Sequence, residues 1–141
     1  MAMSLDLRPG AIIEYPYLWR WQQERGETEG RKERPGCAIL ALHGSDGFTH
    51  LALLAISSQP AGAGQTAIEV PEIELRRAGL TDAKRAWVTV SEYNYDVAER
   101  SWYLDVGRQP LGRFSKSFMA RLATAATPLF RRGRARIDRS R

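Results

Sequence analysis

The sequence predicts a mainly β domain with peripheral helices, built on a small and strongly curved antiparallel sheet. Five or six short apolar segments are separated by turns rich in glycine and proline, which is the pattern of small β barrels. The segment after Ser115 instead places Phe118, Leu122 and Ala125 at helical spacing, so we expect a C-terminal helix.

The chain length suits a single domain, and the charge is concentrated at its end. With 141 residues the chain can bury one core. Residues 131–141 hold six arginines and one aspartate, so they account for the whole net charge of +5. A neutral body with a basic end is weak evidence for nucleic-acid binding. We therefore expect one domain over residues 1–130 and a basic, disordered tail over residues 131–141.

Cysteine usage and hydropathy favour a cytoplasmic protein. Cys37 is the single cysteine, so no disulfide can form within the chain. No segment reaches the roughly 20 consecutive apolar residues that a membrane span needs. The first ten residues lack the pattern of a secretory signal, and we expect no contact with a membrane.

The first strand is expected over residues 11–15, where an apolar run is followed by Pro16. A long polar connection over residues 18–34 comes next, and a connection of this length in a small domain is usually functional or disordered. Four aromatic residues at the junction share one strand phase, which fits the core or an interface better than stacking on bases. These are Tyr15, Tyr17, Trp19 and Trp21.

A β-hairpin is expected over residues 36–56. Two apolar strands, residues 36–44 and 48–56, are joined by the turn sequence "GSDG". Because the strands are antiparallel, counting ten steps outward from the turn brings Arg34 opposite Ser57. Both strands are apolar at nearly every position, which predicts burial on both faces of the sheet.

The remaining elements are shorter, apart from the last helix. They are a strand over 67–70, a helical turn from Pro71 to Gly79, a strand over 86–93, a weaker strand over 100–106 and a helix capped by Ser115 or Ser117. Pro128 is expected to end or kink that helix. Together these elements fit an SH3-like small barrel with a C-terminal helix.

The sequence offers few residues for metal or nucleophilic chemistry. Cys37, His43 and His50 lie too far apart to give a close-spaced ligand pair, so no metal site is expected. The two histidines lie on opposite arms of the hairpin and could act as acid and base on RNA. Histidines with satisfied hydrogen bonds on a sheet are the more frequent case, and Cys37 fits an inert buried thiol.

Arg34 and Ser57 are the strongest candidates for a site. Pro35 holds Arg34 in extended geometry, and a guanidinium on a fixed backbone is a good bidentate phosphate ligand. Ser57 supplies a hydroxyl at the end of the opposite strand. From the residues alone, a solvated arginine beside a turn-forming serine pair is the favoured interpretation of this pattern.

Five segments in order resemble the PemK/MazF family of toxin-like ribonucleases, of which the chain would be a divergent member. They are "RPGAIIEY", "ERPGCAILAL", "LLAISSQP", "VTVSEYNYDV" and "LGRFSKSFMARL", and they cover roughly residues 8–125. The resemblance implies an SH3-like (PemK/MazF/CcdB-like) barrel, usually a homodimer, neutralised by a small acidic antitoxin. It also implies cleavage of single-stranded RNA without metal or cofactor.

The resemblance gives the candidate residues their roles. Arg34 matches the family's arginine before proline and Ser57 matches its threonine, which makes these two the catalytic candidates. Gln59 matches its glutamine, and with Lys32 and Trp19 it is expected to shape an RNA groove.

The chain also departs from the family pattern. The family's opening aspartate is Ala11 here, the first loop is longer and more aromatic, and "YNYDV" replaces a segment with a basic residue. We expect a metal-independent endoribonuclease belonging to a type II toxin-antitoxin system. The alternative is a non-catalytic module on the same fold that binds protein or RNA, such as a gyrase-poison-like toxin.

Overall fold

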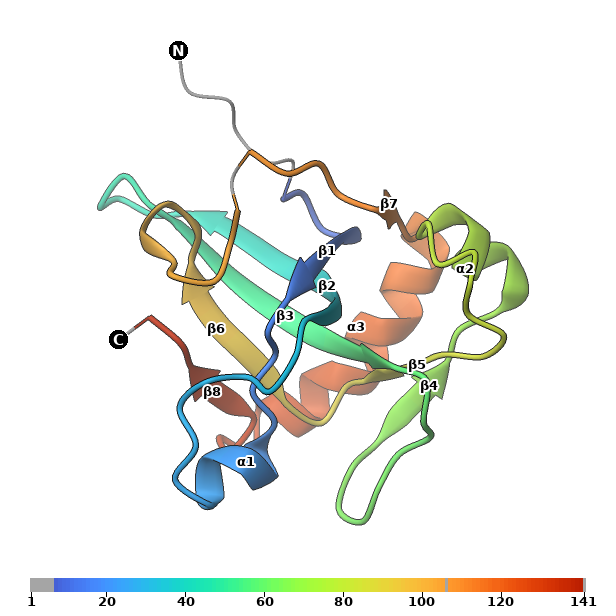
Figure 1. The fold of residues 1–141 in the computed structure, drawn as a ribbon, viewed down its shortest axis with the longest axis horizontal. Helices are drawn as coiled ribbons and strands as arrows, with labels where there is room; N and C mark the ends of the chain where they lie inside the picture. The colour runs from blue at the N-terminus through green and yellow to red at the C-terminus, as the bar shows by residue number, and fades with distance from the viewer. Residues whose placement is uncertain (1–6, 106, 141) are drawn as a thin grey trace.

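A curled sheet in the shape of a half-barrel forms the centre of the molecule (Figure 1). The computed structural model describes residues 7–105 and 107–140. The sheet follows the order β4-β5-β3-β2-β1-β7, with β6 also paired to β3 and β8 paired to β6. The expectation of a mainly β domain with peripheral helices is confirmed. The strands are β1 (Ala11–Tyr15), β2 (Arg34–His43), β3 (Thr49–Ser57), β4 (Ala67–Glu69), β5 (Trp87–Thr89), β6 (Tyr93–Val97), β7 (Gly112–Arg113) and β8 (Arg136–Asp138).

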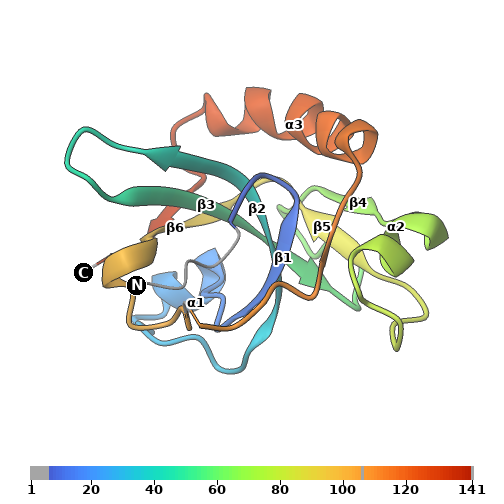
Figure 2. The same ribbon diagram turned by 90° about the horizontal axis from the view of Figure 1, so that it is seen from above.

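The longest helix covers one face of this sheet, as Figure 2 shows. This helix, α3 (Lys116–Phe130), begins after Ser115, whose hydroxyl accepts a hydrogen bond from the Phe118 amide at 3.2 Å. Pro128 lies inside the last turn, so the first of the two expected effects, the end of the helix at this residue, does not occur. The other helices are α1 (Arg20–Glu24), α2 (Glu72–Arg77) and the 3₁₀ turn η1 (Ala98–Arg100). Among the described residues, no helix has the length and apolar character that crossing a membrane requires.

The central hairpin of β2 and β3 is confirmed, with a local irregularity. Near its open end Cys37 pairs with Leu54, in the register that the turn predicted. Toward the turn the pairs are shifted by one residue, so that Leu40 faces Ala52 and Ile39 forms a β-bulge. The bulge compensates for a turn that is one residue longer than expected, and the prediction therefore holds at the open end.

Apolar side chains are buried on both sides of the hairpin, as expected. One cluster lies between the sheet and α3 and contains Leu54, Phe118 and Leu122. The second cluster lies on the other side and contains Tyr15 and Leu53. Because neighbouring residues of a strand point to opposite faces, the near-continuous apolar sequence of β3 supplies both clusters.

The tail was expected to be disordered, and this expectation is wrong for residues 136–140. Arg136–Asp138 forms β8, which pairs in parallel with β6 and buries Ile137 completely. The Arg139 guanidinium is also buried and donates to the Pro16 carbonyl at 2.8 Å and to Asn94 Oδ1 at 3.0 Å. Two buried apolar residues, Ala135 and Ile137, and one internal arginine therefore attach the basic end to the sheet.

Two further expectations are corrected. The segment 86–93 is not one strand, because β5 ends at Thr89 and the chain turns before β6 begins. In this turn the Glu92 carboxylate accepts a hydrogen bond from the Arg20 amide at 3.0 Å. Residues 101–105 form no strand. The Ser101 hydroxyl accepts the amides of Tyr103 and Leu104 there, and these amides are no longer available for a ladder.

Candidate functional site

A pocket of about 260 Å³ opens where β2 begins and β3 ends. It brings together three of the five residues that the sequence singled out, Lys32, Arg34 and Ser57. Continuing the ladder two steps beyond the pair of Gly36 and Ala55 places Arg34 opposite Ser57. The antiparallel hairpin therefore brings together a guanidinium and a hydroxyl that are 23 positions apart in the chain.

Arg34 is held more tightly than an ordinary surface arginine. Its backbone pairs with Tyr15 of β1, and its guanidinium carbon lies 5.2 Å from the centre of the Trp19 ring. Nε is buried and has no hydrogen-bond partner among the described residues. Burial lowers the pKa of Arg34 below its ordinary value, while the nearby Tyr17 opposes this shift. Because Nε is shielded from solvent as well as unpaired, the half-buried positive charge of the guanidinium is what suits the pocket to an anionic ligand.

Ser57 has a hydroxyl whose proton is available. Its Oγ accepts a hydrogen bond from the Gln59 amide at 3.0 Å, in a turn that the sequence Ser-Ser-Gln-Pro favours. No described residue accepts a hydrogen bond from this hydroxyl, so its proton can be donated to a ligand. Gln59 contributes its backbone to this turn, and its exposed side chain does not line the pocket.

Trp19 does not form an open stacking surface, because it lies in the core, as the aromatic pattern favoured. Only 8% of Trp19 is exposed, and its ring packs edge-on against Tyr17 with ring centres 5.0 Å apart. The ring therefore supports Arg34 from within the second cluster and leaves little surface for a base. Trp21, at 39% exposure, lies instead on α1 with the guanidinium groups of Arg25 and Arg31 over its ring.

Two charged residues of the pocket were not predicted from the sequence. Glu33 is the only carboxylate among the described residues that line it, and one of its oxygens lies 3.4 Å from Arg108. Arg85 reaches the pocket from the loop before β5 and makes two hydrogen bonds to Glu69, at 2.8 and 3.0 Å. Glu33 could have been found from its place beside Arg34. Arg85 could not, because its approach depends on the path of the chain after α2.

The remaining candidates behave as structural residues. His50 is bonded through Nδ1 to the Tyr95 hydroxyl at 2.7 Å and through Nε2 to Asp46 at 3.0 Å, as expected for a satisfied sheet histidine. Cys37 is fully buried, and burial raises its pKa to about 12. No cluster of three or more potential metal ligands occurs among the residues that the structure describes.

Comparison of the chain with protein-family models, with curated proteins and with solved structures found no match. The function of the chain is therefore inferred from the site and from the residues that form it.

Proposed function

We propose that the chain is a metal-independent endoribonuclease of the toxin type that cleaves single-stranded RNA. One observation supports this most: a half-buried Arg34 guanidinium shares a pocket with the free hydroxyl proton of Ser57. Both groups can bind the non-bridging oxygens of one phosphate, and Lys32 adds positive charge at the rim. The ordered resemblance to the PemK/MazF family favours RNA over other phosphodiesters.

The reaction that fits these groups is attack by the RNA 2′-hydroxyl on the adjacent phosphorus. The 2′-oxygen loses its proton and forms a bond to phosphorus, while the bond to the 5′-oxygen breaks and that oxygen takes up a proton. The products are a 2′,3′-cyclic phosphate and a free 5′-hydroxyl. Arg34 and Ser57 would stabilise the negative charge that develops on the phosphate oxygens.

The proton transfers can be assigned to two residues of the pocket. Glu33 is the available general base, since it is the carboxylate next to Arg34 in the chain and in the pocket. Burial lowers the pKa of Arg34, which makes its guanidinium a better proton donor to the leaving 5′-oxygen than a solvated arginine would be. Ser57 can donate to a phosphate oxygen because its hydroxyl accepts the Gln59 amide and donates to no described residue.

Cleavage of a mixed single-stranded RNA pool in the presence of EDTA tests the proposal. We expect cyclic-phosphate ends from the wild type and a rate at least ~100-fold lower for Arg34→Ala, because the charge of the transition state loses its main partner. Glu33→Gln should be slowed to a similar extent. Arg31→Ala is the matched control, since Arg31 is exposed, pairs with Glu27 at 2.8 Å and does not line the pocket.

Two results would contradict the proposal. The first is wild-type protein that leaves the RNA intact under these conditions. The second is an Arg34→Ala variant that folds, as judged by circular dichroism, and cleaves as fast as the wild type.

A non-catalytic module is the second candidate, and one observation favours it. Glu33 is half exposed and already has Arg108 as a partner, so the pocket could bind a phosphate without a base to start cleavage. In that case RNA should bind without being cut, or growth arrest on expression should follow inhibition of DNA gyrase and not loss of RNA.

The other properties that the resemblance implies belong to the same proposal. They are an SH3-like type for the half-barrel, a homodimer, a cytoplasmic location and a small acidic antitoxin as partner. Co-expression with a neighbouring small acidic open reading frame, followed by purification and mass measurement, tests the homodimer and the antitoxin, and cell fractionation tests the location.

A further inference from the structure

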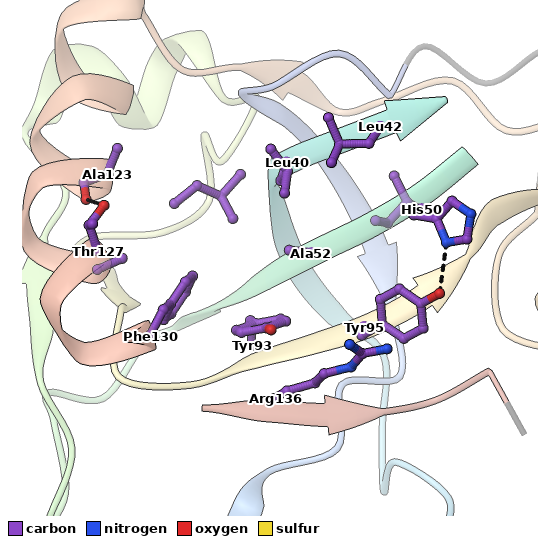
Figure 3. Close-up of a pocket in the computed structure, with 13 residues that line it drawn as sticks. Leu40, Leu42, His50, Ala52, Tyr93, Tyr95, Ala123, Thr127, Phe130 and Arg136 are labelled. Atoms are coloured by element: carbon purple, nitrogen blue, oxygen red, sulfur yellow. Dashed lines mark hydrogen bonds between the residues drawn. The ribbon is translucent and has the colours of Figure 1, made fainter. Parts of the chain in front are cut away.

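A second and larger pocket lies between α3 and the sheet, and it shares no lining residue with the pocket of Arg34. Its volume is about 390 Å³, within the range of small-molecule sites. Figure 3 shows its walls: Ala123, Thr127 and Phe130 come from α3, and Leu40 and Leu42 come from β2. The endonuclease proposal makes no use of this pocket, so the inference below is independent of that proposal.

The walls of this pocket are apolar and partly aromatic. Leu40 and Leu42 are 46% and 55% exposed, although both are large aliphatic side chains. Across the pocket the rings of Tyr93 and Phe130 pack with centres 4.6 Å apart. A concave surface that leaves leucines open to solvent beside an aromatic pair favours a flat apolar ligand.

One charged group at this pocket is available to a ligand. The Arg136 guanidinium lies 3.9 Å from the centre of the Tyr95 ring and has no hydrogen-bond or ion-pair partner among the described residues. No aspartate or glutamate is among the described residues that line the pocket. Of the neighbouring polar groups, His50 and the Tyr95 hydroxyl bond each other and the Thr127 hydroxyl donates to the Ala123 carbonyl at 2.7 Å, whereas the Tyr93 hydroxyl has no hydrogen-bond partner among the described residues.

We propose that this pocket binds a small planar aromatic monocarboxylate. The ring system would lie against Tyr93 and Phe130 on one side and the leucines on the other, and the carboxylate would pair with Arg136. A single free cation with no opposing carboxylate among the described lining residues matches one negative charge. The apolar walls and the limited volume disfavour a polyphosphate or a nucleic-acid backbone, which need several cations.

Calorimetric titration with 2-naphthoate and with its neutral analogue 2-naphthalenemethanol tests this proposal. The wild type should bind the carboxylate about tenfold or more tightly than the alcohol, because a charge-assisted hydrogen bond is lost in the alcohol. Arg136→Gln should remove this preference. Arg134→Gln is the matched control, because Arg134 is an exposed arginine of the same segment that does not line the pocket.

A second pair of variants tests the location of the site. Ala123 is exposed on α3 and lines the pocket, so Ala123→Trp should fill it and remove binding of both compounds. Thr124→Trp changes the adjacent exposed residue, which does not line the pocket, and should leave binding unchanged. The proposal is overturned if the wild type does not bind 2-naphthoate at millimolar concentration. It is equally overturned if folded Arg136→Gln keeps the preference or folded Ala123→Trp keeps the affinity.

Discussion

Arg34 and Cys37 lie three positions apart on β2 and meet opposite environments. Arg34 stands at the open end of the hairpin, where it lines a pocket and is half-buried. Cys37 lies in the cluster beneath α3 and is fully buried. The same strand therefore holds a cation ready for a ligand and a thiol that solvent does not reach, and the difference follows from position along the strand.

Cys37 should be unreactive in the folded protein and should make stability depend on alkaline pH. Ionisation of the thiol begins near pH 9 in the unfolded chain, whereas burial raises the pKa to about 12 in the folded state. Between these values the unfolded chain binds fewer protons, so the free energy of unfolding should fall as pH rises from about 9. Urea titrations of the wild type at several pH values measure this fall.

The Cys37→Ala variant is the control for this effect, because the buried hydroxyls of Tyr15 and Tyr17 have raised pKa values and act in the same direction. The wild type should lose more stability than the variant over this range. Parallel pH dependences of the two proteins, or rapid reaction of native Cys37 with Ellman's reagent at pH 8, would contradict the assignment.

At the scale of elements, β8 shows how a polar segment can be held inside a sheet. Asn94 of β6 accepts the Leu18 amide and donates to the Leu18 carbonyl, both at 2.8 Å. Arg139 adds a bond to the same Asn94 oxygen and lies 4.0 Å from the centre of the Tyr103 ring. The end of the chain, the segment after β1 and the strand β6 are therefore joined by one buried polar network.

Arg139→Ala should lower the free energy of unfolding by about 2–3 kcal/mol. The substitution removes hydrogen bonds from a buried charged group and leaves the Pro16 carbonyl without this donor. Arg134→Ala, at an exposed position, should change stability by no more than about 0.5 kcal/mol. Urea unfolding followed by circular dichroism gives both values. Equal stability of the two variants would mean that the network contributes nothing measurable.

At the scale of the whole molecule, the path of the chain makes the last residues part of the domain. β8 pairs with one edge of β6 and its Ile137 is buried. Both strands lie far from the central hairpin in the sequence. A chain that ends at Phe130 should therefore have a clearly lower unfolding midpoint, or should aggregate through the uncovered strand β6. A chain that ends at Ser140 is the control. Indistinguishable thermal unfolding of the two shortened chains would restore the expectation of a dispensable tail.

The features that could be predicted from the sequence are those that local rules determine. The hairpin, the start of α3 at Ser115 and the approach of Arg34 to Ser57 follow from turn chemistry, capping and the antiparallel register. The tail was missed because its composition is dominated by arginine, and the pairing of Ile137 with Asn94 depends on contacts across the fold. The burial of Trp19 agrees with the preference for the core that the aromatic pattern gave.

The pocket beneath α3 could not be predicted from the sequence, for a geometric reason. Its apolar wall depends on which side of β2 carries Leu40 and Leu42, and strict alternation along the strand gives the wrong side. Partners in a ladder face the same way, and Leu40 is paired with Ala52, which lines the pocket. Sequence alone does not report the bulge at Ile39, because no turn residue marks it.

The bulge at Ile39 therefore decides the chemistry of two surfaces. Cys37 faces α3, and in a regular strand Ala41 and His43 would follow it on that side. With one extra residue in the strand, Leu40 and Leu42 take those places instead. The bulge thus places two leucines on the side of α3, where a regular strand would place Ala41 and His43. In β2 the register of the strand therefore determines which side chains line the pocket as much as the identity of its residues does.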